Sequence, residues 1–148
     1  MIWLLVGSGS YAQAPFDRLA GQWTGSGTID MANGAHERIK CRASYDVLDQ
    51  KRLQLNIRCA SESYNFELRA SAAYSGGAIT GNWSETTRNV AGTISGRADG
   101  ERFQVVARAA SFAASLTLVT HGGRQSVAIR SQDSQSDIKG VSISLRRG

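Results

Sequence analysis

The stretch of sequence that decides the fold is Leu19-Ala20-Gly21-Gln22-Trp23-Thr24-Gly25-Ser26-Gly27-Thr28-Ile29-Asp30-Met31. Its odd positions share one face of an extended chain: Trp23, Gly25, Gly27, Ile29 and Met31. Its even positions are mostly polar, and because side chains alternate between the two faces of a strand, the pattern predicts a strand with one buried face. We expect it to be the first strand of a closed antiparallel barrel, with Trp23 plugging one end.

The rest of the chain repeats this alternation through a succession of short turns. Strong two-residue turn signals occur at Asn33-Gly34 and Asp99-Gly100. Each turn preserves the apolar face, and no segment of useful length has helical periodicity. The sequence therefore predicts an all-β fold: a single up-and-down antiparallel β-barrel of about ten strands. A short N-terminal helical turn, Phe16-Asp17-Arg18-Leu19, is expected to lead into it.

The length of the chain suits one domain. At 148 residues, with 41% hydrophobic and 20% charged residues, it can enclose a single core or cavity. We expect residues 15–148 to form the barrel and residues 1–14 to be a signal peptide or the remnant of one. Ile2-Trp3-Leu4-Leu5-Val6 is an apolar run, and Ala12-Gln13-Ala14 has the small-x-small form of a cleavage site. The usual basic residues before such a run are missing, so a hydrophobic terminus is the alternative.

The two cysteines meet in the predicted hairpin register. A turn centred on Gln50 places Cys41 opposite Cys59, since residues that face each other across a hairpin have numbers with a constant sum. Opposed residues on antiparallel strands have Cα atoms about 4.5 to 5.5 Å apart, within reach of a disulfide. An even number of cysteines in an exported chain favours oxidation, and two buried free thiols are the alternative. The predicted location is periplasmic or secreted.

The Gly-x-Trp sequence at Gly21 and Trp23 resembles the calycin superfamily of lipocalins, fatty-acid-binding proteins, avidins and related bacterial barrels. In that family the motif follows a short helical turn and precedes a meander that ends in a basic residue. The resemblance implies a closing arginine stacked on Trp23, and Arg147 is favoured over Arg146 because it shares the parity of Leu145. It also implies the barrel architecture and, faintly, a ligand-binding role.

The inward face carries the candidate ligand-binding residues. Its aromatic members are Tyr45, Tyr64, Phe66, Trp83 and Phe103. Inward glycines such as Gly81 and Gly92 are expected to leave volume unfilled, which favours a cavity. Glu85 has inward parity beside Leu68 and Gly92, so it is either a polar anchor within that cavity or a strand-end residue that reaches solvent.

The outward face carries many charges, so we expect a soluble barrel, since each charge facing lipid near the bilayer midplane would cost roughly 2 to 4 kcal/mol. The net charge is +5. By the hairpin sums Arg42 faces Arg58, and Arg97 faces Arg102. Opposed like charges repel. Either solvent screens them or an anionic partner binds at Lys40, Arg42, Arg58 and Arg69. Sparse aromatic residues on this face argue against sequence-specific recognition of nucleic acid.

Motifs for catalysis are absent from the sequence. His36 and His121 fall at separate turns, and no nucleophile elbow, phosphate loop or dinucleotide fingerprint occurs. We therefore expect no metal and no cofactor. The sequence favours a non-enzymatic, exported binding protein for a small, largely apolar ligand inside a β-barrel. The alternative is a protein-interaction module, such as a barrel-type periplasmic protease inhibitor or an envelope-associated factor, which a solidly packed barrel would favour.

Overall fold

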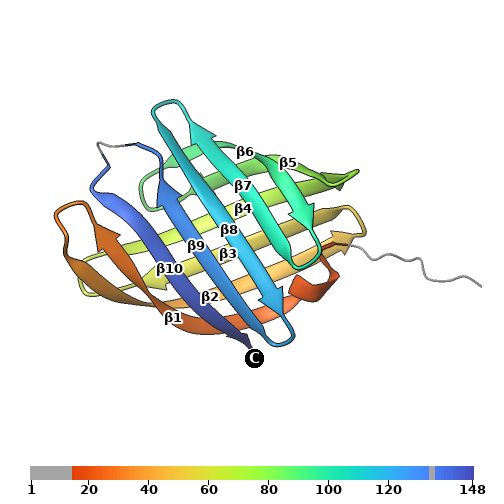
Figure 1. Ribbon diagram of the computed structural model, residues 1–148, viewed down its shortest axis with the longest axis horizontal. Helices are drawn as coiled ribbons and strands as arrows, with labels where there is room; N and C mark the ends of the chain where they lie inside the picture. The colour runs from red at the N-terminus through yellow and green to blue at the C-terminus, as the bar shows by residue number, and fades with distance from the viewer. Residues whose placement is uncertain (1–14, 134–135) are drawn as a thin grey trace, which may run out of the picture.

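Ten antiparallel strands close into a barrel in the computed structural model, which describes residues 15–133 and 136–148 (Figure 1). One 3-10 turn, η1 (Asp17–Leu19), precedes the strands. The strands are β1 (Gly21–Met31), β2 (His36–Asp49), β3 (Arg52–Ala60), β4 (Asn65–Ser75), β5 (Ala78–Glu85), β6 (Val90–Asp99), β7 (Arg102–Ala109), β8 (Phe112–His121), β9 (Arg124–Ser131) and β10 (Ile138–Arg147). Each strand pairs with its neighbours in sequence, and β1 pairs with β10. The predicted fold class is confirmed, whereas the predicted signal segment lies outside the described residues.

The connections divide the barrel into two ends. The β1–β2, β3–β4, β5–β6, β7–β8 and β9–β10 connections lie at one end, which we call the open end. The other connections, η1 and the C-terminus lie at the opposite end, which we call the closed end. Phe16 and Leu19 are buried against the core there. Gly21 then turns the chain into β1 with a φ of +112°, which a residue with a side chain would adopt only under strain.

Trp23 seals the closed end. Its side chain is fully buried, and its indole Nε1 donates a hydrogen bond to the Leu19 carbonyl at 2.8 Å. The Arg147 guanidinium lies over the ring, 4.4 Å from the centroid, in the position that the resemblance implies for a closing arginine. Arg147 also donates hydrogen bonds to the carbonyls of Arg18, at 2.5 Å, and Ala20. The last strand is thereby fastened to the chain that enters the first.

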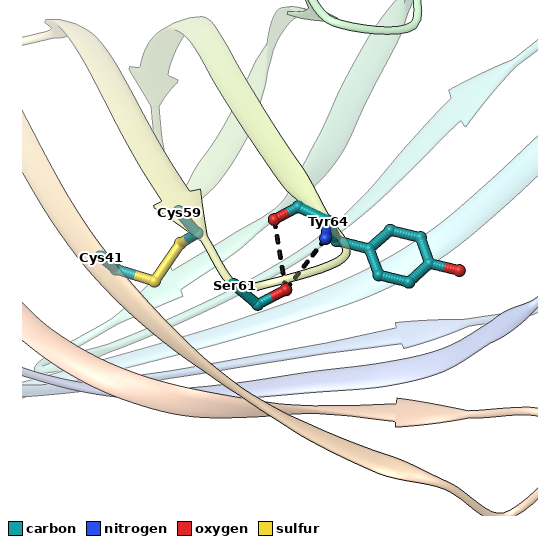
Figure 2. The surroundings of a disulfide bond; sticks show 4 residues. All are labelled: Cys41, Cys59, Ser61 and Tyr64. Atoms are coloured by element: carbon teal, nitrogen blue, oxygen red, sulfur yellow. Dashed lines mark hydrogen bonds between the residues drawn. A yellow bond between two sulfur atoms is a disulfide. The ribbon is translucent and has the colours of Figure 1, made fainter.

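A disulfide joins Cys41 of β2 to Cys59 of β3, with their Cα atoms 4.2 Å apart (Figure 2). The predicted register of this hairpin and the predicted disulfide are confirmed. The β3–β4 connection begins two residues after Cys59. Within it the Ser61 hydroxyl donates to the Tyr64 carbonyl at 3.2 Å and accepts from the Tyr64 amide at 3.0 Å. The disulfide therefore ties two neighbouring strands directly beside a loop of the open end.

The sequence led us to expect that the inward glycines leave volume unfilled, and this expectation is wrong. A Cβ on Gly25 would lie 1.8 Å from the carbonyl oxygen of Ser144, and one on Gly92 would lie 1.7 Å from that of Arg108. The backbone of the neighbouring strand already occupies the space. These glycines instead permit close approach where the strands bend, a recurrent use of glycine in closed barrels.

Candidate functional site

A cavity of about 410 Å³ lies inside the barrel, within the size range of sites for small molecules. Phe16 and Leu19 of the closed end form its floor, and Glu85, Arg88, Ser131 and Ser136 lie at its rim at the open end. Small side chains on β4, β7 and β8 leave the space between floor and rim open: Ala70, Ala72, Ala107 and Ala114. The sequence predicted that glycines would leave the cavity open, whereas the small side chains that do so are alanines.

Most of the predicted aromatic residues line this cavity. The structure brings together Tyr64, Phe66, Trp83 and Phe103, along with Glu85 at the rim. Tyr45 is the exception, because β2 contributes no residue to the lining. The Tyr45 ring packs edge-on against Trp23, with centroids 6.5 Å apart, and its hydroxyl donates to Gln125 Oε1 at 2.5 Å.

Tyr45 instead belongs to a buried polar network at the closed end. The amide of Gln125 donates in turn to the Thr120 hydroxyl at 3.2 Å, and all three side chains are buried. Burial raises the pKa of Tyr45, although its bond to Gln125 acts in the opposite direction. The hydroxyl stays protonated at neutral pH, so this network fastens β2 to β8 and β9.

Two aromatic residues of the cavity escaped the sequence reasoning. Phe112 packs against Trp83 with ring centroids 6.0 Å apart, and its even number gives it the inward parity of Ala114. Continuing the β8 alternation by one step would have identified it. Phe16 stacks on Phe103 at 5.9 Å, but it precedes the strands, so strand alternation carries no signal for it.

Trp83 places an unpaired polar group in the cavity wall. Its side chain is 7% exposed, and its Nε1 lies beside Gly92, 3.0 Å from where a Cβ would stand. Among the described residues it is the buried side-chain nitrogen or oxygen that has no hydrogen-bond partner. An unpaired buried N–H typically costs about 1 to 3 kcal/mol. This indole is therefore less well satisfied than any other buried polar side chain of the described wall.

Glu85 fastens the β5–β6 turn at the rim. Its carboxylate accepts hydrogen bonds from the backbone amides of Glu67 at 2.8 Å, Thr87 at 3.1 Å and Arg88 at 3.0 Å. It also accepts from the Thr87 hydroxyl at 2.6 Å and the Arg88 guanidinium at 3.1 Å. These donors occupy much of the accepting capacity of two carboxylate oxygens. The carboxylate therefore has little hydrogen-bonding capacity left for a ligand.

The ionisation of Glu85 follows from the same contacts. Burial acts to raise the pKa of Glu85, but the hydrogen bonds from Thr87, Glu67 and Arg88 outweigh it and lower the pKa. Its strand partners are Leu68, as the sequence predicted, and Val90. The prediction that Gly92 lies beside Glu85 is wrong, because Gly92 pairs with Trp83.

Of the two arginine pairs predicted on the outer wall, one is present and the other is not. Arg42 faces Arg58. Arg97, however, faces Gln104, and Arg102 faces Asp99. The predicted Arg97–Arg102 pair is therefore wrong: the turn residues are Gly100 and Glu101, not Asp99 and Gly100, so the register differs.

The histidines form pairs with acids at opposite ends of the barrel. His36 lies 2.7 Å from Asp30, and His121 lies 3.1 Å from Glu101. Within residues 15–133 and 136–148 no three His, Cys, Asp or Glu side chains lie close enough to hold a metal ion. The same residues include no helix with the length and apolar character needed to cross a membrane.

Comparison with known proteins yields relatives in structure but not in sequence. No family model matches the chain, and no curated protein matches it. Rv2717c from M. tuberculosis superposes with a TM-score of 0.72 at 10% identity, covering 90% of this chain and 94% of that one. The S-type phycobiliprotein lyase CPES from Guillardia theta gives 0.62 at 11% identity, covering 90% of each chain. A redesigned β-barrel, mFAP1, bound to DFHBI, gives 0.55 at 11% identity, covering 91% of this chain and 100% of that one. At such identities the likeness shows the fold alone.

Proposed function

We propose that this protein is a non-enzymatic binding protein that holds a small, largely apolar ligand inside its barrel. The observation that carries the proposal is the cavity of about 410 Å³, floored by Phe16 and Leu19 and walled almost entirely by apolar side chains. Apolar ligands gain about 25 cal/mol for each Å² of apolar surface removed from water. A preformed cavity of this kind supplies that gain without first ordering the protein.

The ligand we propose has an apolar body and a hydrogen-bond acceptor. The body packs between Trp83, Phe66 and Phe112, whose rings line the cavity. The acceptor reaches the unpaired Nε1 of Trp83 after a small rotation of the indole, which offsets the cost of leaving that N–H unpaired. An inward Glu85 with free oxygens would favour a donor-bearing ligand instead, but the carboxylate already accepts hydrogen bonds from its own turn and from Glu67 of β4.

The structural neighbours give the proposal further support. The redesigned barrel mFAP1 shares this fold and binds DFHBI. The stacking of Arg147 on Trp23 also supports a distant relationship to the calycins. The disulfide fits export to an oxidising compartment, which supports a periplasmic or secreted protein.

The alternative of a protein-interaction module receives less support from the interior. Such a module would be favoured by a solidly packed barrel, whereas the interior leaves a cavity above the roughly 300 Å³ that a small ligand needs. Neither do the rim residues Glu85 and Arg88 suggest acid–base catalysis, since they are ion-paired at 3.1 Å within one turn.

Native mass spectrometry of the protein purified from its own source, without organic solvent, tests this proposal. We expect a fraction of molecules to carry a mass in excess of the chain, which organic extraction removes. The extracted compound should rebind to the stripped protein with one-to-one stoichiometry. Protein that is free of any adduct, and that takes up none from an extract of its source, would contradict the proposal.

A further inference from the structure

One row of cross-strand neighbours on the outer wall carries a succession of arginines. Arg124 of β9 faces Arg146 of β10, and Arg146 faces Thr24 of β1. Thr24 faces Arg42 of β2, which in turn faces Arg58 of β3. All four arginines are exposed. We call this row, Arg124–Arg146–Thr24–Arg42–Arg58, the arginine belt.

The two rows beside the belt, toward the open end, extend its positive charge. They add Lys40 and Arg38, both on β2 and both exposed. Their other members are small: Ser26, Thr28, Ala60, Ser126, Ala128, Ser142 and Ser144. Within these rows on β9, β10, β1, β2 and β3, no described residue is an aspartate or a glutamate. Six cations therefore share a stretch of wall with hydroxyl groups and no acid.

The acid nearest the belt serves only one end of it. Glu67 of β4 faces Arg58 and lies 3.4 Å from its Nε, and it lies 3.2 Å from Arg69. A hydrogen bond from Asn56 at 2.9 Å contributes most to lowering the pKa of Glu67, to about 2, so the carboxylate stays charged. Among the described residues no ion pair involves the other members of the basic stretch: Arg38, Lys40, Arg42, Arg124 and Arg146.

The path of the belt limits the shape of its partner. Arg124 directly follows the β8–β9 turn at the closed end, whereas Arg58 lies two residues from the open-end terminus of β3. In between, the belt passes from β9 and β10, which cross in front of β2 and β3 in Figure 1, around the edge of the barrel. With strands about 4.8 Å apart, it spans roughly 20 Å along a curved wall. A planar membrane cannot contact both sides of this edge, whereas a flexible chain can follow it.

The wall beyond the belt carries groups that suit sugars. An open groove over β3, β4, β5 and β6 has six polar side chains in its lining, Gln54, Asn56, Arg69, Ser71, Asn82 and Ser84, and Leu55, Ala70, Trp83, Ala91 and Gly92 complete the lining. Its amides and hydroxyls both donate and accept hydrogen bonds, as sugar hydroxyls require. Leu48 is the exposed large hydrophobic residue of the described chain, and the described aromatic side chains are buried or half-buried, so no described residue forms a fully exposed aromatic platform for stacking single-stranded bases.

We propose that the arginine belt binds a flexible acidic polysaccharide. Its carboxylate or sulfate groups pair with the arginines, and sugar units that extend past Arg58 place their hydroxyls in the groove over β3 to β6. Bound acidic groups offset the repulsion between Arg42 and Arg58 and between Arg124 and Arg146, which face each other directly. This site lies on the outer wall and does not depend on what fills the cavity.

Fluorescence anisotropy with two labelled probes, a heparin decasaccharide and an alginate oligosaccharide, tests the proposal across a range of NaCl concentrations. The key variant is Arg42→Gln/Arg146→Gln. Its matched control is Arg97→Gln/Arg108→Gln, which removes the same charge from exposed positions on β6 and β7. We expect the belt variant to weaken binding of both probes by about tenfold or more and to lower the salt slope by about two, while the control changes the affinity less than about twofold.

Several outcomes would overturn the proposal. Equal losses in the two double variants would show attraction by net charge alone. Absence of binding to both oligosaccharides would also refute it, as would tighter binding to vesicles containing phosphatidylglycerol or to a single-stranded oligonucleotide of equal charge. If the belt variant fails to fold by circular dichroism, Arg124→Gln alone serves in its place, with Arg97→Gln as its control and a reduction of the salt slope by about one as the expected result.

Discussion

The two tryptophans of the described chain occupy opposite ends of the barrel and differ in how their surroundings satisfy them. Trp23 is fully buried, donates to a carbonyl at 2.8 Å and carries a guanidinium on its ring. Trp83 is also buried, yet its Nε1 has no partner among the described residues, and one of its faces lines a cavity. The closed end therefore contributes stability, whereas the open end keeps a cavity and an unpaired N–H at some expense of stability.

The contrast extends to the charged groups at each end. At the closed end Arg147 bonds to carbonyls more than a hundred residues away in sequence, Arg18 and Ala20, and so fastens the two termini of the barrel together. At the open end Glu85 and Arg88 pair within a single turn, and their hydrogen bonds beyond that turn reach the neighbouring strand β4, at Glu67 and Asn65. The closed-end contacts therefore join β10 to the segment before β1, whereas the rim contacts join neighbouring strands.

Trp23→Ala should break the closed end and give the largest effect. We expect the free energy of unfolding to fall by about 3 to 5 kcal/mol, the usual loss when a fully buried aromatic side chain is truncated. Urea denaturation measures it, with Trp83→Ala for comparison. Because the cavity already removes part of its packing, Trp83→Ala should lose clearly less, and an equal loss would refute the contrast between the two ends.

The disulfide should contribute the second largest share of stability among these sites. Removing it in Cys41→Ala/Cys59→Ala should lower the free energy of unfolding by about 3 kcal/mol, the chain-entropy value for a loop of this length. The sequence separation is 18 residues. Urea unfolding of this variant, compared with the oxidised protein, checks the value. Thiol titration of the unreduced, unfolded protein that finds two free thiols would contradict the pairing.

Arg147→Ala and Arg146→Ala form a matched pair on β10. Arg147→Ala removes the cation over Trp23 and two hydrogen bonds to carbonyls, so we expect a loss of about 1 to 2 kcal/mol. Arg146 points outward, and its replacement should change stability by no more than about 0.5 kcal/mol. Thermal unfolding distinguishes them, and similar melting temperatures for the two variants would show that the closing contact contributes nothing.

Glu85→Gln should produce a smaller loss confined to the rim. We expect a loss of about 1 kcal/mol, because an amide oxygen accepts more weakly than a carboxylate and the new NH₂ group faces donors. An unpaired, desolvated carboxylate would behave in the opposite way, since its neutralisation would leave stability unchanged or raise it. A variant that is more stable than the parent in urea would therefore contradict the hydrogen-bonded role of Glu85. Binding of the cavity ligand should change little.

Glu67 should make a modest contribution that depends on pH. Its pKa is lowered from 4.5 to about 2 in the folded protein, so its contribution is present above pH 4.5 and disappears as the pH falls toward 2. The urea midpoint of the parent should therefore fall more steeply than that of Glu67→Gln over this range. Parallel pH profiles for the two proteins would contradict the lowered pKa.

Strand alternation predicted which way side chains point but not how far along the barrel they lie. Tyr45 and Tyr64 were both expected in the cavity, yet Tyr45 packs against Trp23 while Tyr64 lines the cavity. Depth depends on strand tilt and on η1, and neither leaves a period in the sequence. Glu85 shows the same limit, because the donors that occupy it come from the following turn and from a neighbouring strand.

Hairpin register was predicted correctly at one hairpin and not at another. At the β2–β3 hairpin the two turn residues are Gln50 and Lys51, and a register shift between Val47 and Asp49 restores the pairing of Cys41 with Cys59 that a turn centred on Gln50 predicted. At the β6–β7 hairpin, Asp99-Gly100 had the composition of a two-residue turn, but Gly100, with a φ of +61°, is the first turn residue and Asp99 still pairs with Arg102. One residue of error in the turn removed the predicted Arg97–Arg102 pair.

Titration with the neutral fluorescent probe N-phenyl-1-naphthylamine tests most directly the central claim, that the interior binds a small apolar ligand. Two substitutions on β4 provide the comparison: Ala70→Phe fills the cavity, whereas Ala73→Phe adds the same group to the exposed face. We predict saturable binding at one site, weakened by about tenfold or more in Ala70→Phe and unchanged in Ala73→Phe. Equal affinities in the two folded variants, or no saturable binding by the parent protein, would contradict the claim.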